Sequence, residues 1–341
     1  VYPNQPRNAN NYSVYLIFNF ILFSLFIFNL PNAFAYTLHI IFTRKKAPVI
    51  PYTGFIIGFG IVLSMAFGTV VGTRQLNTNY HDLYFNDLPE AFNEYEIFLF
   101  TDTHLGGMLS PGPLFREAEK VVNQVNPDLV LFAGDLVNNF AYETDGFKDY
   151  FQRITENRHS FSILGNHDYG DYSNWDSNTE KEANFKSLND AHQELGFTLL
   201  RNENVVIKRG TDSIYLAGVE NWGHPPFPQY ARLDSALKNV TSDNFTILMT
   251  HDPAHWESQV ENKKNIHLSV SGHTHGMQWG IKVAGIPFSL AYFSRKYWGG
   301  LYRSGNSVLY VNTGFGTVGV PWRLDMPAEI TVFTLKRGEI N

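Results

Sequence analysis

The stretch EIFLFTDTH, residues 96–104, sets an apolar run directly before polar residues that can bind metal ions. A short apolar run that ends in turn residues is typical of a buried strand. The same arrangement recurs in DLVLFAGD (128–135), SFSILGNHD (160–168), FTILMTHD (245–252) and HLSVSGHTH (267–275). Residues 113–125 and 180–196 have helical spacing, and strands that alternate with helices predict a layered α/β domain.

The polar ends of these five strands are expected to meet, because functional residues of α/β sheets gather at the carboxyl ends of strands. The candidate metal ligands there are Asp102, His104, Asp135, Asn166, His251, His273 and His275. Seven oxygen and nitrogen ligands without sulfur exceed one tetrahedral zinc site and suit two divalent ions. Mixed carboxylate and imidazole sets favour Mn, Fe or Zn over Mg or Ca. We expect Asp135 to bridge the pair.

The spacing within two of these blocks supports the same interpretation. Residues i and i+2 of a strand point to one side, so Asp102 with His104, and His273 with His275, are each expected to face one cavity. Each block alone has an ordinary explanation, as a turn, a capped loop or a partly buried histidine. Their joint occurrence, always at the end of an apolar run, favours a metal centre.

In their order along the chain, the blocks DTH, GD, GNHD, His251 and GHTH resemble the calcineurin-like metallophosphoesterase superfamily. The longer pieces HDPAHW (251–256) and GHTHGMQ (272–278) are similar to a bacterial membrane-associated branch of it. The resemblance covers about residues 92–337 and implies a four-layer α/β/β/α sandwich with a dinuclear site between its sheets. Asn138 stands where many relatives have Asp, and Met277 stands where many have Gly. The longer side chain of Met277 could narrow the choice of substrate at the mouth of the site or pack against Trp279, and we expect packing.

By position, the resemblance implies a role for each site residue. Asp102, His104, Asp135 and His275 would hold one ion, and Asp135, Asn166, His251 and His273 the other. His167 would protonate the leaving oxygen, and Asp168 would orient its ring. The implied reaction is hydrolysis of a phosphoester or pyrophosphate bond by in-line attack of a hydroxide that bridges the two ions. Independently of the resemblance, a histidine beside a ligand Asn is well placed for general acid catalysis.

The first 72 residues differ in composition from the rest, because they contain four basic and no acidic side chains. Two runs approach the roughly 20 apolar residues that cross a bilayer, and Pro31 interrupts the first. We therefore expect a membrane anchor over 1–72, with spans at about 12–30 and 52–71 and an interfacial segment at 31–46, then a linker over 73–91 and a phosphoesterase domain over 92–341. The alternative is a pair of buried helices in a soluble protein.

Charge placement predicts topology and excludes one class of partner. Arg44, Lys45 and Lys46 follow the first run and are expected on the cytoplasmic side, which places the domain on the extracytoplasmic side. Residues after 72 carry a net charge of −10, so we expect no nucleic-acid partner. The chain has no cysteine, which excludes disulfides, thiolate ligands and cysteine nucleophiles.

The predicted function is a membrane-anchored, metal-dependent phosphohydrolase whose substrate is a phosphorylated small molecule or a lipid- or nucleotide-linked envelope phosphate, with manganese among the metals expected. A non-catalytic membrane binding module on the same scaffold is the alternative. The segment 291–305 combines Arg295, Lys296 and Arg303 with five aromatic residues and could hold a lipid phosphate, or it is an ordinary hairpin. Tyr169, Trp175, Trp222 and His255 lie in loops beside the ligand blocks.

Overall fold

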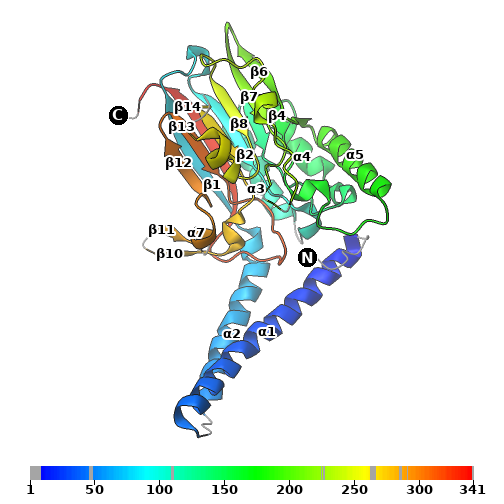
Figure 1. Ribbon diagram of the computed structural model, residues 1–341, viewed down its shortest axis with the longest axis vertical. Coiled ribbons are helices and arrows are strands. Elements are labelled where there is room, and N and C mark those ends of the chain that lie inside the picture. The colour runs from blue at the N-terminus through cyan, green and yellow to red at the C-terminus, as the bar shows by residue number, and fades with distance from the viewer. Residues whose placement is uncertain are drawn as a thin grey trace.

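The computed structural model describes residues 9–45, 49–108, 111–223, 225, 227–261, 266–283, 286–289 and 291–339. Two six-stranded sheets form the centre of the domain, and two long helices, α1 and α2, extend from one end of it (Figure 1). Arg7 and Lys46, which belong to the predicted anchor, lie outside the described residues.

The first sheet has the strand order β1-β14-β2-β3-β4-β5. Its strands are β1 (Leu76–Phe85), β14 (Ala328–Arg337), β2 (Tyr95–Phe100), β3 (Leu129–Phe132), β4 (His159–Ser162) and β5 (Thr198–Leu199). Strands β2 to β5 are parallel to one another, and β14 is antiparallel to β2 but parallel to β1. The carboxyl ends of β2, β3 and β4 therefore share one edge.

The second sheet has the order β12-β13-β9-β8-β7-β6. Its strands are β12 (Gly300–Ser304), β13 (Ser307–Val311), β9 (Leu268–Ser271), β8 (Thr246–Met249), β7 (Asp212–Gly218) and β6 (Glu203–Arg209). The four inner strands are parallel, and hairpins place β12 and β6 antiparallel at the two edges. A separate two-stranded hairpin pairs β10 (Ile281–Val283) with β11 (Ile286–Phe288).

Alternating side chains divide the core into layers, as the period of two in a strand requires. In β2, Ile97 and Leu99 pack between the two sheets, whereas Phe98 and Phe100 pack on the opposite face. That outer face is covered by α3 (Pro111–Val125), α4 (Lys148–Thr155) and α5 (Asn178–Glu194). The outer face of the second sheet packs against α6 (Leu233–Ala236) and a π-helical turn at Trp256–Val260. The result is the predicted four-layer α/β/β/α sandwich.

Residues 76–85, predicted as part of a linker, instead form β1. This strand pairs with all of β14, and Leu83 and Phe85 at its end are buried in the core between the sheets. β14 therefore lies inside the sheet, between β1 and β2. The alternation of β1 was overlooked because polar residues fill its first half, which remains partly exposed.

The two N-terminal helices are α1 (Ala9–Thr43) and α2 (Val49–Val70). Helix α1 continues through Pro31, so the predicted break at that residue was wrong. A proline removes one backbone hydrogen bond, but in apolar surroundings the remaining backbone groups still favour a continuous helix. A last short helix, α7 (Ala291–Ser294), follows the β10–β11 hairpin.

Within the described residues, Leu25–Thr43 and Ile56–Arg74 are long and apolar enough to cross a membrane. These windows are only 0% and 22% buried, and large side chains such as Phe42 and Ile56 point away from the rest of the protein. Helices of a soluble core would instead be largely buried. The exposure therefore argues against the alternative of two buried helices.

The end of α2 is packed tightly against the domain. The backbone N–H of Arg323 donates to the carbonyl of Gly68 at 3.2 Å. One turn later, a Cβ on Gly72 would overlap the carbonyl oxygen of Arg323, so only glycine allows this approach. Helix α2 is thus joined to the loop before β14 and not only to the start of β1.

Candidate metal centre

The predicted ligands follow the strands in sharp turns and do not lie on the strands themselves. Five of them have positive φ: Asp102 (55°), His104 (44°), Asp135 (55°), His273 (74°) and His275 (51°). Positive φ is unusual for residues other than glycine and is often retained at functional sites. The i, i+2 argument from strand geometry was therefore wrong, because left-handed turns aim these side chains. Backbone hydrogen bonds stabilise them, as in Asp102 N–H to the Gly134 carbonyl at 2.9 Å.

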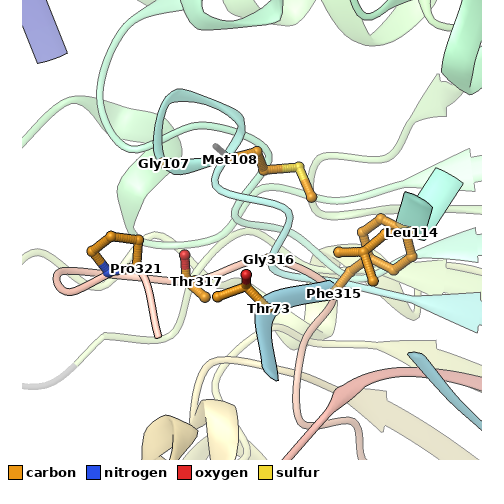
Figure 2. Close-up of a pocket in the computed structure, with 8 residues that line it drawn as sticks. All are labelled: Thr73, Gly107, Met108, Leu114, Phe315, Gly316, Thr317 and Pro321. Atoms are coloured by element: carbon orange, nitrogen blue, oxygen red, sulfur yellow. The ribbon is translucent and has the colours of Figure 1, made fainter. Parts of the chain in front are cut away.

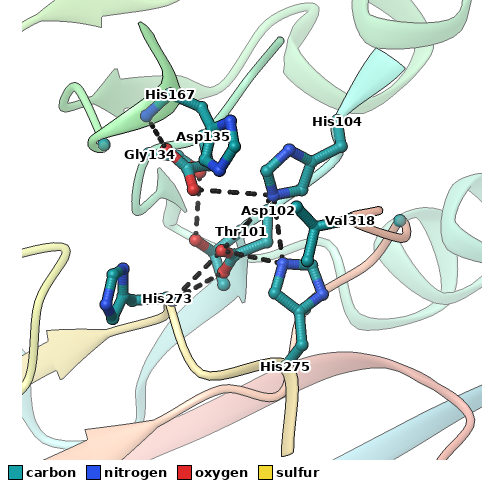
Figure 3. Close-up of polar contacts among 12 residues, drawn as sticks. Thr101, Asp102, His104, Gly134, Asp135, His167, His273, His275 and Val318 are labelled. Carbon is teal, nitrogen blue, oxygen red and sulfur yellow. Dashed lines mark hydrogen bonds and ion pairs between the residues drawn. The ribbon is translucent and has the colours of Figure 1, made fainter. Parts of the chain in front are cut away.

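One group of ligand atoms consists of Asp102, His104 and His275. His275 Nε2 lies 3.3 Å from Asp102 Oδ1, and the Nε2 atoms of His104 and His275 are 3.0 Å apart. All three residues are buried. Figure 3 shows His104 and His275 on one side of the two central carboxylates, and His273 on the other.

A second group consists of Asp135, His251 and His273. Asp135 Oδ2 lies 3.2 Å from His251 Nε2 and 3.5 Å from His104 Nε2, so this oxygen is close to rings of both groups. His273 Nδ1 lies 2.7 Å from Asn166 Oδ1. The structure therefore brings all seven predicted ligands into one cluster, with Asp135 between its two halves.

Charge in this cluster is unbalanced, because Asp102 and Asp135 are both buried. Burial would raise the pKa of Asp135, but His251 and His167 hold it well below its usual range. Burial also opposes protonation of His251, yet Asp135 and Asp102 outweigh it and raise the pKa of His251 to about 10. Two buried carboxylates thus require positive charge beside them, which a proton or a bound cation can supply.

The nitrogen atom of His251 that faces the cluster provides a test of whether metal ions fit. Among the described residues, His251 Nε2 is buried and makes no hydrogen bond, although it lies 3.2 Å from Asp135 Oδ2. His251 Nδ1 donates to the carbonyl of Ala133 at 2.8 Å, which directs Nε2 toward Asp135. A backbone carbonyl that fixes the ring in this way is typical of metal-binding histidines. The oxygen and nitrogen donors therefore fit divalent cations.

His167 lies at the edge of the cluster, beside both Asp135 and His104. Its Nδ1 donates to the Asn138 carbonyl at 2.9 Å, and its ring stacks on Tyr172 with the centroids 4.4 Å apart. Burial lowers the pKa of His167, and the nearby Asp135 carboxylate opposes that shift. The ring is thus held by the hydrogen bond from Nδ1 to Asn138 and by the stacking of its face on Tyr172.

The role predicted for Asp168 was wrong, because its carboxylate does not orient His167. Both of its oxygens accept hydrogen bonds from backbone N–H groups at 2.9–3.2 Å, donated by Asp135, Leu136, Val137 and Gly165. Asp168 therefore fixes the two ligand loops relative to each other, and the Asn138 carbonyl orients the His167 ring. Burial and the neighbouring Asp135 raise the pKa of Asp168 to about 7, against the effect of these N–H donors.

Three residues near the centre were missed by the sequence analysis. Tyr172 accepts a hydrogen bond from the Asn166 amide at 2.9 Å, and Glu143 accepts four backbone N–H bonds, three of them from residues 138–140. Arg323 is buried and donates to the carbonyls of residues 313, 314, 316, 326 and 327. Its Nη2 also lies 3.4 Å from His275 Nδ1. No motif marks these residues, since each acts through backbone groups or side-chain packing.

The other residues noted in the sequence have varied positions. Tyr169 is buried and stacks on Tyr230, and the Trp175 indole donates to the carbonyl of Gly170 at 2.7 Å, so both stabilise local structure. Trp222 stacks on His255 with the ring centroids 4.9 Å apart. Met277 is half-exposed, and its packing against Trp279 stays a prediction. Lys296 pairs with Glu257 at 2.9 Å.

Comparison with known proteins defines the class. The calcineurin-like phosphoesterase family matches residues 95–277, more than half of the chain. The protein therefore belongs to this family, and it is a metal-dependent phosphohydrolase. The clustered Asp and His side chains agree with a requirement for divalent metal ions.

Individual relatives extend the comparison. The uncharacterized metallophosphoesterase YkuE of Bacillus subtilis is 28% identical, over 77% of this chain and 86% of that protein. A transmembrane protein with metallophosphoesterase domain from Danio rerio is 28% identical, over 73% of this chain and 55% of that protein. An uncharacterized metallophosphoesterase of Helicobacter pylori strain J99 is 32% identical, over 73% and 61%. This chain thus spans little more than half the length of the last two.

Proposed function

We propose that this protein is a membrane-anchored phosphohydrolase with a dinuclear metal centre, and that it hydrolyses a phosphoester or pyrophosphate bond of an envelope lipid or nucleotide-linked substrate. The observation that carries the proposal is the position of Asp135, whose carboxylate is within 3.5 Å of rings from both halves of the cluster. A carboxylate between two sets of ligands is suited to bridging two ions.

The proposed ligand sets follow the two halves. Asp102, His104, Asp135 and His275 would hold one ion, and Asp135, Asn166, His251 and His273 the other. Such ions, when bound, supply an activated water and neutralise the charge of the reacting phosphate. Mn, Fe and Zn all suit this donor set.

In this proposal the protein itself positions the substrate and moves one proton. A P–O bond to the leaving group breaks while a hydroxide oxygen becomes bonded to phosphorus, the water that provides the hydroxide having released its proton to solvent. His167 would donate the proton from Nε2 to the leaving oxygen, because Nδ1 is occupied by the Asn138 carbonyl. Tyr172 would hold the ring in place by stacking. General acid catalysis of this kind typically contributes about 10²–10⁴-fold.

Membrane anchoring is supported by the two exposed apolar helices and by the similarity to proteins named as transmembrane. In the proposed topology both helices cross the bilayer, and the turn that contains Arg44 and Lys45 lies on the cytoplasmic side. The domain would then be extracytoplasmic, where envelope phosphates are accessible.

Hydrolysis of bis-p-nitrophenyl phosphate by the full chain in detergent tests the proposed activity. We expect turnover after loading with Mn²⁺, loss of turnover in EDTA, and recovery when Mn²⁺, Zn²⁺ or Fe²⁺ is restored. Elemental analysis should find about two metal ions per chain. Metal binding without turnover of phosphodiester, phosphomonoester or pyrophosphate substrates would instead support a non-catalytic binding module.

A further inference from the structure

Four large side chains between the ligand loop and β12 are exposed to an unusual degree. Met277 is 51% exposed, Phe288 38%, Tyr292 66% and Phe293 74%. They lie after His275, on β11 and on α7, and we call them the aromatic rim. In Figure 1 the β10–β11 hairpin and α7 lie at the end of the domain from which α2 extends. Grouped apolar side chains on a protein surface commonly mark a site of interaction.

The segment that carries Phe288, Tyr292 and Phe293 is hydrogen-bonded to the metal-ligand loop. The Ser289 hydroxyl donates to the carbonyl of Gly276 at 2.6 Å, and Gly276 follows the proposed ligand His275. The same hydroxyl accepts from the N–H of Ala291, the first residue of α7, at 3.2 Å. The rim and the ligand loop therefore form one connected unit.

The same unit is bonded to the candidate membrane span. Gly280 N–H donates to the carbonyl of Leu324 at 2.9 Å, and the adjacent Arg323 N–H donates to Gly68 in α2. Thr73, just after α2, lines a small pocket with Gly107 and Met108, which closely follow His104 (Figure 2). The end of the span, the aromatic rim and the loops that follow His104 and His275 thus lie at the same end of the molecule.

The chemistry of this face fits a lipid surface. Tyrosine and other aromatic side chains are favoured where a bilayer meets water, and basic side chains are attracted by lipid phosphates. Arg295 follows α7 and is exposed. A cation next to the aromatic rim suits an anionic headgroup.

We infer that the aromatic rim inserts into the leaflet next to the domain, in the same bilayer that α2 crosses, and that the metal centre takes its phosphorylated substrate from that lipid surface. Insertion of the aromatic rim is inferred from the exposed side chains alone. The inference that the substrate comes from the bilayer also rests on the proposed function. Arg295 would contact the phosphate of the headgroup.

Depth measurement tests the docking without any assay of activity. The chain has no cysteine, so Phe293→Cys can carry a single spin label, and Val206→Cys on β6, 44% exposed, is the matched control. Both are reconstituted as full chains, loaded with Zn²⁺, in phosphatidylglycerol/phosphatidylcholine nanodiscs. We expect the label at 293 to collide with oxygen rather than a water-soluble nickel chelate, and the label at 206 to do the opposite. Equal access of the nickel chelate to both labels would overturn the inference.

A ratio of two activities tests the substrate. The probes are hexadecyl p-nitrophenyl phosphate in the same nanodiscs and bis-p-nitrophenyl phosphate in solution. We expect Tyr292→Ser/Phe293→Ser to lower turnover of the lipid probe about tenfold relative to the soluble one, and Val206→Ser to leave the ratio unchanged. If the ratio of lipid-probe to soluble-probe turnover is unchanged in the double variant, the inference that the substrate comes from the lipid surface is wrong. If the native chain hydrolyses neither probe, the proposed function fails, and the label depths still decide the docking.

Discussion

Buried carboxylates determine the chemistry of the metal centre at the scale of single residues. Asp102 and Asp135 are fully or almost fully buried, and each lies within 3.3 Å of a histidine nitrogen. Charges removed from water are stable only when opposite charge and hydrogen bonds compensate for the lost hydration. Cations therefore stabilise the centre. A substitution that removes the negative charge of one ligand residue should lower both the metal occupancy and the rate of hydrolysis.

Replacing Asp135 by Asn tests this charge balance directly. Asp135→Asn keeps the shape of the side chain but removes the charge proposed to bridge the two ions. We expect bound metal, measured by elemental analysis, to fall and turnover to drop by at least about tenfold. Asp149→Asn, at an exposed position of α4, should change neither. Native metal content in Asp135→Asn would contradict the bridging role.

His167 should affect the rate without affecting the metals. In His167→Ala the two proposed ligand sets are complete, so we expect full metal content. Turnover of an alkyl phosphodiester, whose leaving oxygen needs a proton, should fall by about 10²–10⁴-fold, and turnover of a p-nitrophenyl ester much less. His159→Ala, at the exposed start of β4, is the control. An equal loss on both esters would mean that His167 holds the phosphate and does not protonate the leaving group.

The sequence could predict which side chains gather at the centre but not how they are held. Seven candidate ligands follow from residue types at the ends of apolar runs. The turn geometry could not be predicted, because Asp102 and His273 have positive φ in turns held by hydrogen bonds to distant segments, Asp102 to the Gly134 carbonyl and His273 to the Asp102 carboxylate. The role of Asp168 could not be predicted for the same reason, because its partners are backbone N–H groups of two loops.

At the scale of elements, strands with a strong apolar period were predicted well. β2 and β3 are buried on both faces and read as continuous apolar runs. β1 was missed because it is an edge strand with one half-exposed face, which resembles a polar linker. Arg323, which joins α2 to the ligand loop, lies far from both in sequence and carries no local signal.

The contact between α2 and the domain depends on Gly72. In Gly72→Ala the new methyl group would overlap the Arg323 carbonyl, so the helix and the loop must separate. We expect a loss of stability of about 1–3 kcal/mol, seen as a lower melting temperature of the full chain in detergent. Gly60→Ala, within α2, is the control, because no described atom lies near the added methyl. Equal melting temperatures for both variants would contradict this junction.

The contact between α5 and β4 should make stability depend on pH. His192 is buried and bonds through Nδ1 to the Ser162 hydroxyl at 2.9 Å, and burial lowers its pKa from 6.5 to about 3. Below pH 6.5 the unfolded chain takes up a proton that the folded chain refuses, so stability falls as pH decreases toward 3. Between pH 7 and pH 5, this one group should lower the free energy of unfolding by about 2 kcal/mol.

His192→Asn isolates this contribution, because Asn can keep the bond to Ser162 but does not titrate. Tryptophan fluorescence of the full chain in detergent gives the melting temperature at pH 7 and pH 5. We expect the native chain to lose more stability than His192→Asn over this interval. Parallel losses in the two proteins would show that His192 does not contribute.

At the scale of the whole molecule, the two apolar helices form a hairpin that leads away from the domain. Helices α1 and α2 contact each other and diverge toward the domain, and the turn between them is at the end opposite the two sheets (Figure 1). The sequence predicted both helices from composition alone. It could not predict that the α2 end packs onto the loop that carries Arg323, because this contact joins positions about 250 residues apart.

This shape makes the topology testable with single cysteines. If both helices cross the bilayer, the turn and the domain must lie on opposite sides, and the basic turn favours the cytoplasm. Lys45→Cys and Lys208→Cys place one exposed thiol in the turn and one on β6 of an otherwise cysteine-free chain. With a membrane-impermeant maleimide, we expect Lys208→Cys to be labelled in intact cells and Lys45→Cys only after permeabilisation. The reverse pattern would place the domain in the cytoplasm, and labelling of both in intact cells would mean that the helices lie on the membrane without crossing it.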